Sequence, residues 1–219
     1  MTSLEVITLL MLSLAPSLSV LIYGVVVRWK SSWVLSILGG GGWLIALLLR
    51  VPLLYLLLNK VEENTYLIIA SYAAGIFEES IRYVILRSPL VRNPRIGDAI
   101  VLGLGWGVTE ALFIYVIPIL IYPYNDYNIL ELLPGAIERN IAVVAHLIFS
   151  VLVMVSVSNF KYLLVAIITH GTLNIAGITI LKITGDAWVT EAFLAIIVTV
   201  LALATAIMIR ISNDKYARI

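Results

Sequence analysis

The chain is divided into apolar runs, each about 20 residues long or longer, by short charged or turn-forming segments. An α-helix of this length spans the hydrocarbon core of a bilayer, where a backbone must satisfy its own hydrogen bonds. Charged residues make up only 12% of the chain, about half of their share in soluble domains. We therefore expect an all-α, multi-pass protein of the cell membrane. The expected spans are residues 4–27, 32–58, 64–87, 97–122, 136–158, 161–183 and 187–211.

The connections between these spans are too short to contain a soluble domain, so we expect a single transmembrane domain over residues 1–219. The first apolar run is longer than the core of a signal peptide, and we expect it to be retained. The absence of cysteine excludes disulfides, thiolate metal sites and a thiol nucleophile. The run from Gly39 to Gly42 is expected to loosen or kink the second span.

Basic residues are distributed unequally between the two sides of the predicted bundle. One side has Arg28, Lys30, Arg87, Arg92, Arg95, Lys161, Arg210, Lys215 and Arg218. The other side has only Lys60 and Lys182. Because cytoplasmic loops carry an excess of lysine and arginine, the N-terminus is expected outside and the C-terminus in the cytoplasm. This split also favours an odd number of spans, about seven.

The third span contains two adjacent glutamates, Glu78 and Glu79, with Arg82 one helical turn later. A charged side chain at mid-bilayer costs about 2.5–3.5 kcal/mol on insertion scales, so three within five residues require a structural or chemical purpose. Arg82 lies within reach of either carboxylate on the helix surface. A purely structural ion pair of Glu79 with Arg82 is an equally good interpretation. In the second span, Arg50 is expected to snorkel to the surface or to pair.

Three other spans place polar side chains at a similar depth. At a rise of about 1.5 Å per residue, Glu78 and His170 lie roughly 13 Å above the cytoplasmic ends of their spans, His146 about 18 Å, Asn174 about 20 Å and Glu110 about 22 Å. In a core about 30 Å thick these groups share the middle slab, so we expect them to converge in one hydrated pocket. Residues 64–183 are therefore the predicted core that carries the site.

Helical spacing supports this convergence. His170 and Asn174 share one face of the sixth span. In the fourth span, glycines on the face of Glu110 would let a neighbouring helix approach and bring its polar groups near that carboxylate. Arg139, two turns before His146, is expected to cap the pocket from the outer side. His146 taken alone is more typical of a hydrogen-bonded packing residue.

The set of residues suits peptide hydrolysis, which needs an activated water, a proton donor for the leaving amine and a group that stabilises an oxyanion. A desolvated glutamate can act as general base and then acid, and a neutral histidine or an asparagine amide can donate to the oxyanion. Alternatively, glutamate and histidine can hold zinc with one position open for water. Metal-free and metal-assisted hydrolysis both fit. The candidate metal ligands are Glu78, Glu79, Glu110, His146 and His170.

Four motifs occur in order between about residue 64 and residue 180. They are Phe77-Glu78-Glu79-Ser80-Ile81-Arg82-Tyr83, Gly103-Leu104-Gly105-Trp106-Gly107-Val108-Thr109-Glu110-Ala111, Glu138-Arg139 with His146, and His170-xxx-Asn174. Together they resemble the YhfC-like intramembrane metalloproteases. That family shares a superfamily with the CAAX-protease and bacteriocin-processing (CPBP) enzymes, the PrsW proteases and the anterior-pharynx-defective subunit of γ-secretase. The resemblance implies a CPBP-like helical core.

The resemblance also implies roles for individual residues. Glu78 and Glu79 match the paired glutamates that are credited with water activation in the CPBP enzymes. His170 and Asn174 match the final motif that is credited with binding the oxyanion. The glutamate motif, Glu-Glu-x-x-Arg, is one residue shorter than the CPBP pattern.

A second departure from the CPBP pattern lies in the fourth span. Trp106-xxx-Glu110 stands where the family pattern has Phe-xxx-His. We expect His146, on the next helix, to take the place of the missing histidine.

The first functional hypothesis is therefore an intramembrane protease acting on a membrane peptide or protein. Its candidate catalytic residues are Glu78, Glu79, Arg82, Glu110, His146, His170 and Asn174. The second is a non-catalytic assembly subunit, like the γ-secretase subunit, whose polar interior stabilises packing or binds a partner helix. The third is a proton-linked transporter, which the lack of a detectable inverted repeat makes less favourable. The expected partners are the lipid bilayer and a substrate or partner helix within it, and no nucleic acid.

Overall fold

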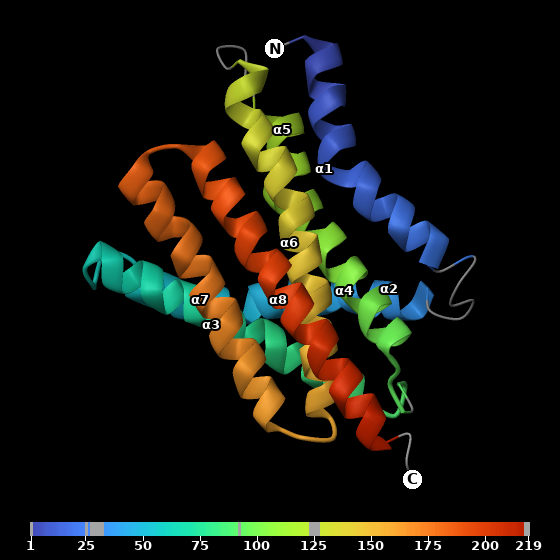
Figure 1. Ribbon diagram of the computed structural model, residues 1–219. Helices are drawn as coiled ribbons and strands as arrows, with labels where there is room; N and C mark the ends of the chain where they lie inside the picture. Colours follow the sequence, from blue (N-terminus) through green and yellow to red (C-terminus); the bar gives the residue numbers. More distant parts are fainter. Residues whose placement is uncertain (1, 25, 27–32, 92, 123–127, 217–219) are drawn as a thin grey trace.

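The computed structural model describes residues 2–24, 26, 33–91, 93–122 and 128–216, with the backbone alone for residues 211–216. The described residues form helices and no strands, which confirms the all-α prediction. The helices are α1 (Ser3–Tyr23), α2 (Trp33–Leu57), α3 (Glu63–Arg87), α4 (Ile96–Ala111), the π-helical η2 (Leu112–Val116), α5 (Ile117–Ile121), α6 (Ile129–Ser156), α7 (Lys161–Thr184) and α8 (Ala187–Tyr216). Because α4, η2 and α5 are continuous, the described chain forms seven helical rods (Figure 1).

Six of these rods are long and apolar enough to cross a membrane. They are Ser3–Tyr23, Trp33–Leu57, Ile96–Ile121, Ile129–Ser156, Lys161–Thr184 and Ala187–Arg210. The remaining rod, α3, has 25 residues, enough for a crossing, but it carries Glu78, Glu79 and Arg82 and is not among the six. The chain is a multi-pass membrane protein, and a seventh crossing through α3 stays a prediction.

Two helix ends follow from local capping. α7 ends at Gly185, whose φ of 65° lies in the left-handed region that glycine adopts without strain. α6 begins earlier than the expected residue 136, because the side chain of Asn128 accepts a hydrogen bond from the backbone N–H of Leu130. The helix then continues through Pro134 with the loss of one internal hydrogen bond. The expected start of this span at residue 136 was therefore too late.

The glycines of α2 serve close helix packing. α2 is one unbroken helix through this segment. A Cβ atom added to Gly39 would lie 2.2 Å from the carbonyl oxygen of Leu102, and one added to Gly105 would lie 2.1 Å from that of Ser36. The backbones of α2 and α4 therefore touch where only glycine fits, a form of association typical of membrane helices.

The helices are arranged in two directions. In the view of Figure 1, α4, α6, α7 and α8 run between the top and the bottom of the molecule, whereas α2 and α3 run across them. The largest apolar cluster is centred on Phe149 of α6 and includes Leu86 of α3, Leu102 of α4, Leu163 of α7 and Val198 of α8. α3 thus packs its charged middle turns against the interior of the bundle.

The first turn of α1 and the last turn of α8 lie at opposite ends of the bundle (Figure 1). Which end faces the cytoplasm stays a prediction. Of the basic residues behind that prediction, Arg28, Lys30, Arg92 and Arg218 lie outside the described residues, and the side chain of Lys215 is not described.

Candidate active site

A cavity of about 580 Å³ lies in the middle of the bundle. Residues of α2, α3, α4, α6, α7 and α8 form its walls, which are mainly apolar. The polar side chains in the walls are Arg50, Ser71, Glu78, Glu110, Glu138, Arg139, His146, His170, Asn174, Thr190 and Glu191. A few ionisable groups in an otherwise apolar cavity are typical of a functional site in a membrane protein.

Glu78 faces this cavity from α3, and both of its carboxylate oxygens have a donor. Nη1 of Arg50 on α2 lies 2.9 Å from Oε1. The indole N–H of Trp106 on α4 donates to Oε2 over 2.9 Å. Because Glu78 is 2% exposed, these two contacts hold the orientation of its carboxylate. The expectation that Arg50 snorkels or pairs is thus decided in favour of a pair.

Glu110 faces the cavity from α4 and has three partners. Trp43 on α2 donates its indole N–H to Oε2 over 2.9 Å, and Nη1 of Arg139 on α6 lies 3.1 Å from Oε1. Nε2 of His146 lies 3.0 Å from Oε2. Arg139 also forms an ion pair with its neighbour Glu138. The negative charge of Glu110 is therefore compensated by Arg139 of α6, and Trp43 of α2 orients the carboxylate.

Glycines on α4 bring His146 to Glu110, as expected from their shared face. A Cβ atom added to Gly103 would lie 2.8 Å from the carbonyl oxygen of His146, and one added to Gly107 would lie 2.9 Å from Cα of Val143. α4 and α6 are therefore in backbone contact along this face.

His146 has a partner on each ring nitrogen, and these partners define its tautomer. Nη2 of Arg82 lies 3.2 Å from Nδ1. Since a guanidinium group only donates, Nδ1 accepts. The ring proton then lies on Nε2, which donates to Glu110. The ring is 3% exposed.

Glu79 and Arg82 lie behind the cavity. Of the described residues, the cavity walls include Glu78 but neither Glu79 nor Arg82, both of which are fully buried. The two form an ion pair, and Oε1 of Glu79 lies 2.7 Å from Nδ1 of His170. An ionised carboxylate only accepts, so Nδ1 of His170 donates, while the ring stacks on Phe149 with centroids 4.7 Å apart. Glu79 therefore orients His170, which lines the cavity.

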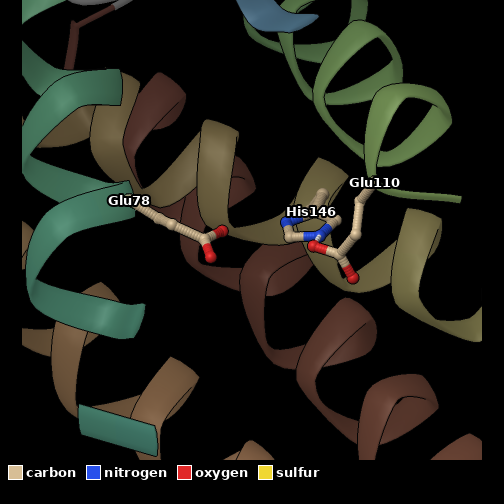
Figure 2. A group of neighbouring side chains, drawn as sticks. All are labelled: Glu78, Glu110 and His146. Atoms are coloured by element: carbon tan, nitrogen blue, oxygen red, sulfur yellow. Dashed lines mark hydrogen bonds and ion pairs between the residues drawn. The ribbon is translucent and has the colours of Figure 1, made fainter. Parts of the chain in front are cut away.

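Three of these residues could hold a metal ion. Glu78, Glu110 and His146 each offer one ligand atom, and these atoms all lie within 4.8 Å of one another. Figure 2 shows Glu78 extending from α3 toward His146 and Glu110 on the other side of the group. Carboxylate oxygen and imidazole nitrogen are ligand types that zinc accepts, and three protein ligands leave a fourth position open for water. We call these three residues the carboxylate–histidine group.

The structure thus sorts the residues that were singled out in the sequence. The candidate catalytic residues that line the cavity are Glu78, Glu110, His146, His170 and Asn174, and Arg50 and Arg139 line it too. Sequence reasoning missed Trp43 and assigned no hydrogen bond to Trp106. The available signal was spacing: Trp43 and Arg50 lie seven residues apart on one face of α2, and Trp106 lies one turn before Glu110.

Comparisons with known proteins agree with this picture. The model of the YhfC intramembrane metalloprotease family matches residues 17–124. This segment contains Trp43, Arg50, Glu78, Trp106 and Glu110, while the two histidines lie beyond it. No curated protein matches the chain. Over residues 17–124 the chain is thus similar to the YhfC intramembrane metalloproteases, the family that its motifs resemble.

Proposed function

We propose that this chain is an intramembrane metalloprotease, which hydrolyses a peptide bond of a membrane peptide or protein inside the central cavity. The observation that carries the proposal is the carboxylate–histidine group, whose ligand atoms lie within 4.8 Å of one another in the cavity wall. The description of the family that matches residues 17–124 supports the same chemistry. The links to the CPBP enzymes, PrsW and the γ-secretase subunit are consistent with it and stay predictions.

Zinc is the proposed metal, because it accepts carboxylate oxygen and imidazole nitrogen ligands. When bound, it activates a water molecule as the nucleophile for hydrolysis. Both ring nitrogens of His146 already have a partner, so ligation by this residue replaces either its contact with Arg82 or its contact with Glu110. Glu78 and Glu110 each keep an arginine nearby, which limits the charge that a substrate meets.

Two further cavity residues, His170 and Asn174, are suited to proton transfer and to binding the substrate carbonyl. His170 holds its ring proton on Nδ1 toward Glu79, which leaves Nε2 to accept a proton from water and return it to the leaving amine as the C–N bond breaks. Asn174 lies one turn further along the same face of α7 and lines the cavity. Its amide can donate to the oxygen of the peptide carbonyl as negative charge develops there.

The test uses the purified chain in lipid vesicles with membrane peptides as substrates. We expect elemental analysis to find bound zinc and the chain to cleave the peptides. Both zinc and cleavage should be lost in the Glu78→Gln and Glu110→Gln variants, which should remain folded. Glu63→Gln is the matched control, since Glu63 is exposed and pairs with Lys182 away from the cavity. Cleavage that persists in a Glu78→Gln, Glu110→Gln double variant would rule the proposal out.

A second function is favoured by one observation. Three buried or cavity-lining glutamates are each paired with an arginine, namely Glu78 with Arg50, Glu79 with Arg82 and Glu110 with Arg139. Such compensated pairs also suit a non-catalytic subunit that binds a partner helix in its cavity. That function predicts no zinc in the purified chain, and variants of the glutamates that lose a bound partner rather than an activity.

A further inference from the structure

Two buried tryptophans donate hydrogen bonds to the two carboxylates of the carboxylate–histidine group. The indole N–H of Trp106 lies 2.9 Å from Oε2 of Glu78, and that of Trp43 lies 2.9 Å from Oε2 of Glu110. Each carboxylate therefore receives one indole and one arginine, and Glu110 also contacts His146. An indole N–H only donates and carries no net charge, so it sets the direction of a carboxylate without cancelling its charge.

Packing fixes both indoles. Trp43 is 1% exposed and Trp106 is fully buried, and together with Ala46 they form one apolar cluster. A Cβ atom added to Gly42 would lie 2.7 Å from the ring of Trp106. The guanidinium group of Arg82 lies over the same indole, 4.2 Å from its ring centroid. Trp106 is thus enclosed on both sides, while Trp43 lines the cavity and packs on Phe113, with ring centroids 5.8 Å apart. Both N–H groups are therefore placed by the packing of α2 against α4.

α2 contacts both carboxylates of the carboxylate–histidine group. Trp43 and Arg50 lie seven residues apart on one face of this helix, yet they bind different carboxylates. α4 in turn carries Glu110 and donates to Glu78 through Trp106. The spacing between the two carboxylates therefore depends on how closely α2 packs against α4.

We propose that Trp43 and Trp106 are positioning residues of the metal group: their N–H groups hold one oxygen of each carboxylate and present the carboxylates to a metal ion in a fixed orientation. This inference rests on the proposed function and goes beyond it, because neither residue is a ligand. Hydrogen bonds of this kind orient metal ligands, and their loss typically lowers metal affinity by about 10- to 100-fold.

The experiment measures zinc binding by titration calorimetry with the full chain in detergent. We expect Trp43→Phe and Trp106→Phe to lower zinc affinity by about 10- to 100-fold each. Trp188→Phe, at an exposed position of α8, is the matched control and should bind zinc like the unaltered chain. Site-specific replacement of either tryptophan by benzothienylalanine keeps the bicyclic shape and removes only the N–H. It should lower the affinity as phenylalanine does, while the packing of the ring stays unchanged.

Cobalt provides an independent signature, since its visible spectrum reports the ligand geometry that a merely structural role would leave unaltered. We expect a changed spectrum in both tryptophan variants. Unchanged zinc affinity with benzothienylalanine at both positions would overturn the inference and leave the proposed function intact, provided that Glu78→Gln and Glu110→Gln abolish binding. An unaltered chain that binds no zinc, or binds it equally well without these glutamates, would overturn the proposed function itself.

Discussion

Arg82 on α3 donates a hydrogen bond from Nη2 to Nδ1 of His146 on α6 over a distance of 3.2 Å. The same guanidinium group forms an ion pair with Glu79, which in turn contacts His170 on α7. One fully buried arginine therefore connects the two histidines of the cavity, whose ring centroids lie 6.0 Å apart. Arg82 thus holds the two histidine rings in place from outside the cavity, directly for His146 and through Glu79 for His170.

Removing this arginine should destabilise the fold as well as the site. Arg82→Met leaves Glu79 as an uncompensated buried charge, for which a loss of about 3–5 kcal/mol in unfolding free energy is expected. The double variant Glu79→Gln, Arg82→Met removes both charges and should recover most of that loss. Reversible unfolding in mixed micelles measures both changes. Equal stability of the single and double variants would contradict a structural pair.

Variants of the two histidines should separate zinc binding from proton transfer. His146→Gln removes a residue of the carboxylate–histidine group, so zinc binding and cleavage should both fall. His170→Gln keeps a hydrogen-bonding partner for Glu79 and leaves the group intact, so zinc binding should persist while cleavage slows by about 10²- to 10⁴-fold. Zinc titration and initial rates on the same preparations check this. Loss of zinc from both variants alike would show that His170 is itself a ligand.

Zinc should stabilise the folded chain. A metal that binds only the native state at 100 times its dissociation constant adds about 2.7 kcal/mol to the unfolding free energy. We therefore expect a chelator to lower the thermal midpoint and added zinc to restore it. The Glu110→Gln variant should show no zinc-dependent shift, whereas Glu63→Gln should behave like the unaltered chain.

The contact between α2 and α4 should tolerate no side chain at its centre. Gly105→Ala would place a Cβ atom 2.1 Å from the carbonyl oxygen of Ser36, so the helices must separate, at a cost of about 1–3 kcal/mol. Gly41→Ala is the matched control, because its Cβ atom would meet nothing within 4 Å. It should leave stability unchanged or raise it by up to about 1 kcal/mol, since alanine favours helix. Unfolding measurements that rank the two variants the other way would contradict the packing.

The predicted orientation can be tested without background, because the chain has no cysteine. Ser158→Cys lies in the exposed turn between α6 and α7, and Lys60→Cys lies in the exposed turn between α2 and α3. In intact cells a membrane-impermeant maleimide should label only the second of these, since it is expected outside. The reverse labelling pattern would place the N-terminus in the cytoplasm.

Much of the helical architecture follows from the sequence because hydrophobic length is a local property. Runs of about 20 apolar residues predict membrane-spanning helices with little reference to their neighbours. The resemblance to the YhfC family is also readable from the sequence, since Glu78, Glu79 and Glu110 stand in short ordered motifs. The start of α6 could not be read from Pro134, because a helix in a bundle can lose one hydrogen bond that packing elsewhere offsets.

The chain by itself predicted which polar groups share one depth of the bilayer, because a helix converts residue number into height at a constant rise. Only the tertiary structure decided which of those groups face the cavity and which stand behind it. The rotation and crossing of helices depend on contacts between distant residues, such as the approach of Gly105 to Ser36. That approach brought Trp43 to Glu110 and left Glu79 behind the cavity, facing His170, a division that depth alone does not specify.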